Sequence, residues 1–457
     1  MKVCSVARPY RVSVDLDRYG APMTERYLGA GTIARDHSQL TGVVPAHLPQ
    51  RLTITLWDFS WYTQAGPGQP YEDLDAVVAD AASLGYNAIR ICAAPMLMFG
   101  GLGLDDLARD LEIEGLGPAP DGGFYGQRTR WYDTAGGFRV DMFARTRQLF
   151  EAARRHNLVI VLASWEYQQS ASFAASPRWF EAMDAIALDG RYDALAAAWT
   201  RMIVWLTEAG FRDMIALVEV HNEVDFSILP DITLPAGRAA VAGLAEAHPD
   251  LLVTASYGKP PHLSMHEVPE ELGTAQFHIY SYGVLDELQK RIDIRSEGTE
   301  DFPNATLRSL MRRDAPAFGE YGRPLDWKMR ATVITDQMVY GYDWVDPEAW
   351  DGWLNEHYAP FAEVMAREIE SRVIAIAEWA RWRGIPAMVG EGWIGYTPLH
   401  GTFEEGEIGR GLAEHGIRTA LARGVWGMVL CSNAAPHHPM WQLREWQRAM
   451  NAEILAA

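Results

Sequence analysis

The chain has 457 residues, of which 48% are hydrophobic, and its formal net charge is −20 at neutral pH. A surface this acidic repels phosphate backbones and anionic membrane faces, so the composition argues against nucleic acid or a membrane as partner and favours a neutral ligand. No apolar stretch approaches the roughly 18 residues that can span a bilayer. The length suits one elaborated domain, because a (β/α) barrel with insertions can exceed about 400 residues.

The amino terminus and the cysteines bear on the compartment. The first residues include Lys2 but no apolar region, so the sequence predicts no secretory signal and a cytoplasmic protein. Cys4, Cys92 and Cys431 lie far apart, which suits free thiols in a reducing compartment. The adjacent His437-His438 pair lacks the i, i+4 spacing of two ligands on one helix face, so neither a metal nor a cofactor is expected.

Strands and helices alternate along most of the chain. Residues 1–50 mix glycine and proline throughout, and we expect them to form a lead-in that packs on the domain formed by residues 51–457. Short apolar runs predict eight strands: Leu52–Trp57, Ala88–Cys92, Leu158–Ala163, Met214–Val220, Leu251–Ser256, Ala275–His278, Ala387–Glu391 and Val425–Cys431. Helical spacing of apolar residues predicts helices near 74–84, 139–156, 192–209, 361–383, 406–422 and 441–454.

This alternation predicts an α/β fold, the (β/α)8 TIM barrel. Strands that are continuously apolar belong to a parallel sheet whose outer face is covered by helices. Strand–helix alternation gives right-handed βαβ units, and eight of them close a barrel. An open, doubly wound sheet is the alternative, but no glycine-rich phosphate loop follows the first strand.

Three connections are long: 93–138, 164–191 and about 281–358. All three leave the carboxyl ends of predicted strands, where a TIM barrel carries its active site. The insertion at 281–358 is rich in tyrosine and tryptophan, and we expect it to form a lid or a wall of the pocket.

Two glutamates stand just past predicted strands. Glu223 follows the fourth strand and Glu391 ends the seventh. Two facing carboxylates shift each other's pKa values, so that one stays protonated as an acid while the other stays ionised. Cleavage of a glycosidic bond needs this division of labour. Arg90, flanked by isoleucines inside the second strand, cannot lose its charge and needs a carboxylate partner, for which Glu391 is the obvious choice.

These motifs together resemble those of the clan A glycoside hydrolases, retaining barrel enzymes that include the cellulase-like family. Within that family, the chain most resembles the sugar-binding cellulase-like group, and the resemblance covers about residues 50–440. The residues that carry it are Arg90 on strand two, Asn222-Glu223 after strand four, His278-Ile279-Tyr280 at strand six and Glu391 at strand seven.

The resemblance implies a role for each of these positions. Glu223 would be the general acid/base and Glu391 the nucleophile of a double displacement. Asn222 would bind the sugar 2-hydroxyl, Arg90 would keep the nucleophile ionised, and Tyr280 would hydrogen-bond it. His278 precedes that tyrosine as it does in many relatives, although a satisfied core histidine is the alternative.

Two departures from the family pattern concern the sugar. Many relatives carry a tryptophan floor just past strand eight, where this chain has Cys431-Ser432-Asn433-Ala434. Trp393 or Trp441 could supply the floor instead. Where relatives have a histidine after strand three, this chain has Trp165-Glu166-Tyr167. The further predicted substrate-binding residues are Trp57, Asp58, Trp165, Glu166, His221 and Trp393.

The sequence thus predicts a retaining glycoside hydrolase that acts on a small glycoside or short oligosaccharide, exo-wise on a β-linked sugar. A cytoplasmic address argues against a polymer substrate. A sugar-binding barrel without turnover is one alternative, and a transglycosidase that uses the same two glutamates is another. The sugar, the linkage and the oligomeric state, including a homo-oligomer, are left open.

Overall fold

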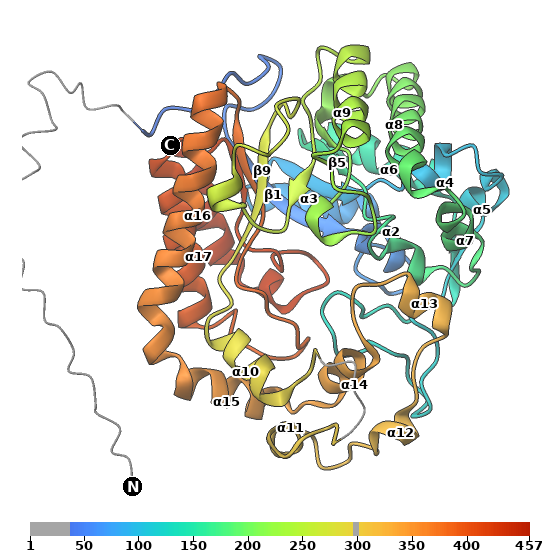
Figure 1. Ribbon diagram of the computed structural model, residues 1–457, viewed down its shortest axis with the longest axis vertical. Helices are drawn as coiled ribbons and strands as arrows, with labels where there is room; N and C mark the ends of the chain where they lie inside the picture. Colours follow the sequence, from blue (N-terminus) through green and yellow to red (C-terminus); the bar gives the residue numbers. More distant parts are fainter. Residues whose placement is uncertain (1–36, 296–300) are drawn as a thin grey trace, which may run out of the picture. The chain divides into compact units, whose positions relative to one another are not determined.

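The computed structural model describes residues 37–295 and 301–457 (Figure 1). Residues Ser38–Ala457 form one compact unit. Of the expected lead-in at 1–50, residues 1–36 lie outside the described residues. The part from 38 onward contacts the barrel: Thr41 N donates to Gly424 O at 3.2 Å, and Trp426 Nε1 donates to Pro49 O at 3.0 Å.

The central sheet is a barrel of parallel strands. Its strands are β1 (Leu52–Asp58), β2 (Ala88–Cys92), β5 (Val159–Ala163), β6 (Ile215–Glu219), β7 (Val253–Thr254), β8 (Ser256–Tyr257), β9 (Ala275–Tyr280), β10 (Ala387–Trp393) and β11 (Gly427–Val429). The hydrogen-bonded order is β7-β6-β5-β2-β1-β11-β10-β9-β8. Only Ala255 separates β7 from β8, so these two short strands are one segment, which joins β6 on one side and β9 on the other. With β7 and β8 counted as one strand, the sheet therefore closes into a barrel of eight strands.

The predicted TIM barrel and its eight strands are thus confirmed, and the open doubly wound sheet is excluded. Every residue of β1, β2 and β6 is buried, as expected for strands enclosed by helices outside and side chains inside. The barrel helices are α3 (Leu74–Ser83), α6 (Met142–Arg155), α8 (Arg191–Glu208), α9 (Pro235–Ala247), α16 (Ala362–Arg383), α17 (Glu407–Ala422) and α18 (Arg444–Ala456). Of these, α9 was not predicted.

Local signals explain where several helices begin and end. Asp73 caps α3, where its side chain accepts from the backbone N–H groups of Asp75 and Ala76. Gly384 follows α16 with φ at +68°, the left-handed conformation that glycine adopts without steric cost. None of the helices within the described residues is both long and apolar enough to cross a bilayer.

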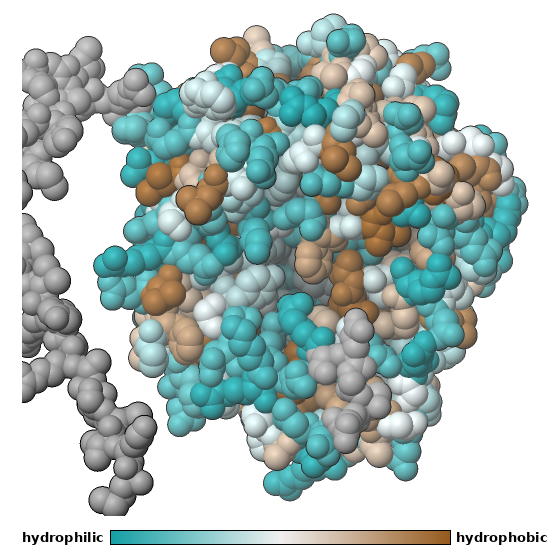
Figure 2. Space-filling view, in the orientation of Figure 1, coloured by the Kyte–Doolittle hydropathy of each residue, from teal (hydrophilic) through white to brown (hydrophobic). Residues whose placement is uncertain are grey.

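The long connections carry small elements of their own. They are α2 (Ser60–Thr63), α4 (Pro95–Phe99), α5 (Asp105–Arg109), the two-stranded sheet of β3 (Leu111–Ile113) and β4 (Phe138–Val140), and α7 (Arg178–Asp184). The insertion at 281–358 holds α10 (Val284–Ile292), α11 (Ala305–Leu310), α12 (Phe318–Tyr321), α13 (Asp326–Arg330), α14 (Asp336–Trp344) and α15 (Pro347–His357). Figure 1 shows these helices gathered at one end of the barrel, in the lower part of the view. Figure 2 shows a mostly hydrophilic face with a hollow near its middle.

Candidate active site

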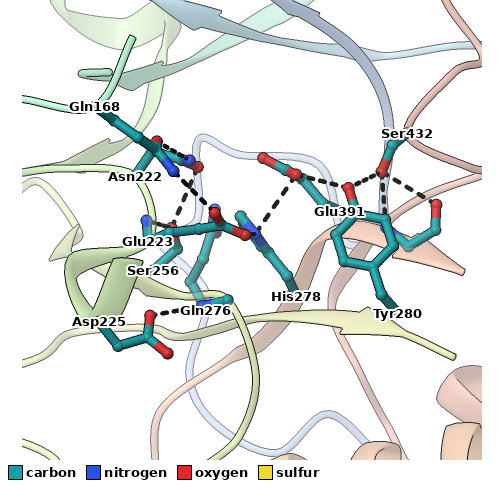
Figure 3. Close-up of polar contacts among 12 residues, drawn as sticks. Gln168, Asn222, Glu223, Asp225, Ser256, Gln276, His278, Tyr280, Glu391 and Ser432 are labelled. Carbon is teal, nitrogen blue, oxygen red and sulfur yellow. Dashed lines mark hydrogen bonds and ion pairs between the residues drawn. The ribbon is translucent and has the colours of Figure 1, made fainter. Parts of the chain in front are cut away.

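Glu223 and Glu391 face each other at the carboxyl ends of β6 and β10 (Figure 3). His278, on β9, lies between them: its Nδ1 is 2.8 Å from Glu223 Oε1 and 3.5 Å from Glu391 Oε2. One carboxylate oxygen of each glutamate lies within 4.8 Å of the other. Carboxyl groups about 5–5.5 Å apart suit a retaining mechanism, whereas inverting enzymes separate them by about 6.5–9.5 Å to admit a water.

Arg90 anchors this pair from inside the barrel. Its Nη1 donates to Glu391 Oε1 at 2.9 Å, which is the ion pair that the sequence predicts. Its Nε and Nη2 also form a two-pronged contact with Glu219, at 3.0 and 2.7 Å, and Nη2 donates to Asn222 Oδ1 at 2.6 Å. The guanidinium and the Glu219 carboxylate are fully buried. Two carboxylates around one arginine satisfy its fork of donors and hold Glu391 in a fixed orientation.

Glu219 was missed by sequence reasoning. The signal was present, because a glutamate within the apolar run of β6 needs a cationic partner just as Arg90 needs an anionic one. Gln276 Nε2 donates to Glu219 Oε2 at 2.6 Å and completes the buried network.

Tyr280 holds the other oxygen of Glu391. Its hydroxyl donates to Glu391 Oε2 at 2.7 Å and lies 2.7 Å from Ser432 Oγ. Burial raises the pKa of Tyr280 well above its ordinary value, so the hydroxyl keeps the proton that it donates. Ser432 in turn accepts from the backbone N–H of Gly392 at 2.9 Å. Ser432 thus lies against the tyrosine hydroxyl and helps to orient it.

The surroundings of Glu223 make its carboxyl group a weaker acid than an exposed glutamate. Burial raises the pKa of Glu223 to about 6, while the hydrogen bond from Gln168 Nε2 to Glu223 Oε2, 2.9 Å long, lowers it. Burial lowers the pKa of His278 to about 4, so its ring is neutral. Arg90 can only donate to His278 Nε2, at 3.5 Å, which leaves the proton on Nδ1 facing Glu223.

A cavity of about 170 Å³ opens over the two glutamates. Its polar lining includes Gln168, Asn222, Ser432 and Asn433. Its aromatic lining comprises Trp131, Tyr132, Trp165, Phe226, Tyr280, Tyr282, Tyr342 and Tyr396. The insertion at 281–358 thus contributes a wall of the pocket, and Trp165 lies over the Arg90 guanidinium at 4.6 Å. Apart from Trp165 and Tyr280, sequence reasoning singled out none of these aromatic residues as a site residue, because they come from loops without a strand-end signal.

Trp57, which was expected to face the sugar, and the two expected floor residues, Trp393 and Trp441, do not line this cavity. Trp57 is fully buried, and its Nε1 donates to Thr55 Oγ1 at 3.1 Å. Trp393 donates to Leu430 O at 3.1 Å and packs against α17, where Gly416 leaves room for the ring. Trp441 donates to Asp80 at 2.9 Å, away from the two glutamates. These tryptophans are packing residues, which corrects their assignment to the sugar.

Glu166 and His221 also serve the scaffold. Glu166 accepts from the N–H groups of Met96 and Leu97 at 2.9 and 2.8 Å. His221 Nε2 accepts from Tyr167 N at 3.1 Å, and its Nδ1 donates to the Asn222 carbonyl at 2.6 Å. Both side chains are thus committed to protein partners, so the structure does not place them against a substrate in the catalytic cavity.

Asp58 lies apart from the cavity lining. It is fully buried at the end of β1, where its Oδ1 accepts from Ser60 N at 2.5 Å. Its Oδ2 is 3.9 Å from His437 Nε2. Burial raises the pKa of Asp58 well above its ordinary value, and the charge of Glu391 adds to that rise.

Glu223, His278 and Glu391 are also the group of described residues whose donor atoms lie close enough to hold a metal ion. The positive guanidinium of Arg90 contacts Glu391 directly at 2.9 Å. A cation there would have to compete with this ion pair and with the hydrogen bond between His278 and Glu223. The arrangement therefore fits acid–base chemistry better than metal binding.

The sequence matches the family model described as sugar-binding cellulase-like over residues 54–106 and 342–455. No curated protein is similar in sequence. Among solved structures, a protein from Parabacteroides distasonis described as a candidate glycoside hydrolase matches with a TM-score of 0.62 and 18% identity, over 89% of this chain and 94% of that one. A glycoside hydrolase family 5 mannosidase from Rhizomucor miehei matches with a TM-score of 0.46 and 12% identity, over 93% and 98%.

The match to the family model includes β1, β2, β10 and β11, and so it contains Arg90 and Glu391 but not Glu223. The structural likeness to the Parabacteroides protein extends over nearly the whole barrel. The resemblance that the sequence motifs indicated is thereby confirmed: this chain is a TIM barrel of the kind found in the glycoside hydrolases, and it resembles the sugar-binding cellulase-like family.

Proposed function

We propose that the protein is a retaining glycoside hydrolase that cleaves a small β-linked glycoside by double displacement. The observation that carries the proposal is the facing pair Glu223 and Glu391, with oxygens within 4.8 Å of each other and unequal surroundings. Glu391 accepts hydrogen bonds from Arg90 and Tyr280, which fix the orientation of its carboxylate. Glu223 is buried with a raised pKa and can carry a proton.

In the first step, Glu391 attacks the anomeric carbon while Glu223 protonates the departing oxygen. The glycosidic bond breaks and a glycosyl–Glu391 ester forms. In the second step, Glu223 takes a proton from water, whose oxygen attacks the anomeric carbon and releases Glu391. Asn222, held by Arg90 and Gln168, faces the same cavity, where we propose that it binds a sugar hydroxyl.

The walls of the cavity support a small substrate taken from one end. The insertion at 281–358 and the connection at 93–138 both contribute lining residues, among them Tyr342 and Trp131, so the barrel mouth is a pocket and not an open groove.

A panel of chromogenic β-glycosides tests the proposal, with the configuration of the released sugar followed by NMR spectroscopy. We expect the sugar to be released first with its anomeric configuration retained. Release with inverted configuration would exclude the double displacement. Glu391→Gln should lose at least about a thousandfold in kcat yet still bind the glycoside, because an amide is a poor nucleophile. Glu112→Gln, an exposed position of β3, is the matched control and should retain full turnover.

The variant Glu223→Gln separates proton donation by Glu223 from nucleophilic attack by Glu391. A substrate with a good leaving group, such as a dinitrophenyl glycoside, needs little proton donation, so the variant should keep the first step for it and lose alkyl glycosides. Equal losses for both substrates would assign the acid to another residue. Added alcohol acceptors distinguish a transglycosidase, which would form new glycosides in preference to free sugar. A sugar-binding barrel would bind the panel without turnover.

A further inference from the structure

A second cavity adjoins the catalytic one. It has a volume of about 220 Å³, and the two share Gln168, Phe226 and Val333 as lining residues. Figure 2 shows apolar side chains gathered beside the hollow of this face. Because these three residues line both, the two cavities lie side by side.

The shared wall lies on the side of the acid and not of the nucleophile. Gln168 Nε2 donates to Glu223 Oε2 at 2.9 Å, and Phe226 N donates to Glu223 O at 2.7 Å. Both glutamates line only the catalytic cavity, and it is Glu223 that contacts the shared wall. Because a general acid delivers its proton to the departing oxygen, the group attached to that oxygen extends towards Glu223. The second cavity is therefore where the aglycone of a glycoside would lie.

The lining of this cavity is mainly apolar. Its apolar residues are Phe180, Met183, Phe226, Ile228, Ala331 and Val333, and they contribute most of its exposed lining surface. Phe226 and Ile228 are 58% and 46% exposed, an unusual position for large apolar side chains next to a polar site. Contact with an apolar ligand would remove this surface from water, which is the main source of affinity for such groups.

Several polar side chains of the cavity already have protein partners, although the buried Tyr167 hydroxyl has none. Arg330 Nη2 pairs with Asp184 Oδ2 at 2.7 Å, and the guanidinium lies over the Phe180 ring at 5.2 Å. Thr332 Oγ1 contacts Tyr132 OH at 2.5 Å. A second sugar ring would bring several hydroxyls that lose their hydrogen bonds to water, and each unpaired hydroxyl costs about 1–3 kcal/mol. An alkyl or aryl group brings no such cost.

We propose that the second cavity is a binding site for an apolar aglycone, so that the substrate is an alkyl or aryl glycoside and not an oligosaccharide. This inference rests on the proposed function of Glu223 as the acid. On cleavage the aglycone leaves as the free alcohol with the proton of Glu223, and water supplies the hydroxyl of the released sugar.

Methyl, butyl and hexyl β-D-glucosides and β-D-mannosides test the inference, with cellobiose and mannobiose as sugar-aglycone comparisons. Hydrolysis is measured with the wild-type protein, and binding with Glu391→Gln by calorimetry. Each methylene that enters the cavity should raise the affinity by up to about fourfold, the equivalent of roughly 0.8 kcal/mol. Ile228→Ser should weaken hexyl glycosides at least threefold and leave methyl glycosides unchanged, while Leu263→Ser, at a 97% exposed site outside both cavities, should change neither.

The outcomes separate the two proposals. Turnover without any effect of chain length, or a preference for the disaccharides, would overturn the aglycone site and leave the hydrolase intact. Binding that tightens with chain length in the absence of turnover would overturn the hydrolase and support an apolar site beside Glu223. A chain-length effect that Ile228→Ser leaves untouched would place the alkyl group elsewhere and overturn the assignment to this cavity.

Discussion

At the scale of single residues, Gln168 affects the acid strength of Glu223 through a single hydrogen bond. Its hydrogen bond to Glu223 stabilises the ionised carboxylate and so lowers a pKa that burial raises to about 6. Gln168→Met removes the donor, and the pKa of Glu223 should rise by roughly half a unit to one unit. Because Glu223 acts in its protonated form, the fall of kcat/KM at high pH should move to higher pH by that amount.

A pH profile of kcat/KM measures this shift. Gln169→Met is the matched control, because Gln169 lines the same cavity but accepts from Tyr132 at 2.7 Å and does not contact Glu223. This control can lower activity but should not change the pH at which kcat/KM falls. If that pH is also unchanged in Gln168→Met, a group other than Glu223 governs the fall.

The residues that sequence reasoning found share one property: a charge or a hydroxyl next to an apolar strand. Arg90 and Glu391 were paired correctly because a buried guanidinium requires an anion. The same signal at Glu219 was overlooked, since one partner appeared sufficient for Arg90. The aromatic lining could not be found in this way, because Trp131 and Tyr342 reach the pocket from loops whose path depends on distant contacts.

At the scale of elements, Glu166 shows how a strand-end carboxylate can serve structure. It follows β5 and accepts from the first turn of α4, through Met96 and Leu97 N–H, and also from Ser164 and Trp179. The carboxylate thereby fixes α4, which packs against α8. Position in the sequence alone did not distinguish this role from substrate binding.

Glu166→Gln should lower the free energy of unfolding by about 1–3 kcal/mol, because the amide nitrogen cannot accept from donors that the carboxylate satisfies. Burial raises the pKa of Glu166 to about 7, so the denaturant titration is best done at a pH above that value, where the native side chain is ionised. Glu112→Gln, half-exposed on β3, should change stability little. Equal stability of both variants would show that the Glu166 contacts contribute nothing.

The barrel helices were predicted where their apolar residues recur clearly, as in α3 and α16. The exception, α9, spans Pro235–Ala247 and consists largely of alanine and glycine. Small side chains pack closely against α8 without large apolar residues at helical spacing. The pattern that marks a helix was therefore weak in this segment, although the proline at its start and the alanines suit one.

At the scale of the whole molecule, the strand order of a TIM barrel followed from the alternation of elements, but the pocket did not. Closure of the sheet brings β2, β6, β9 and β10 to one rim and so assembles residues as far apart as Arg90 and Glu391. The three long connections then have to meet one another above that rim. Their mutual contacts depend on side chains that no local pattern reveals.

Lys328 is one such side chain. It lies on α13 in the insertion, fully buried, and its Nζ donates to the carbonyls of Gly115, Ser172 and Ala174 at 2.7, 3.1 and 2.9 Å. It also pairs with Glu114 at 3.0 Å. One ammonium group thus joins all three long connections, 93–138, 164–191 and 281–358.

Lys328→Met keeps the length of the side chain and removes its donors, which leaves buried carbonyls unpaired at a cost of about 1–3 kcal/mol. Because the barrel itself does not contain this contact, the insertion should loosen while the barrel stays folded. We expect faster limited proteolysis within 281–358 and a KM that rises more than kcat falls, since the insertion forms a wall of the pocket and not the catalytic pair. Lys290→Met, on an exposed face of α10, is the matched control and should leave both unchanged. Cooperative unfolding of the whole chain in the Lys328 variant would instead show that the insertion and the barrel are a single folding unit.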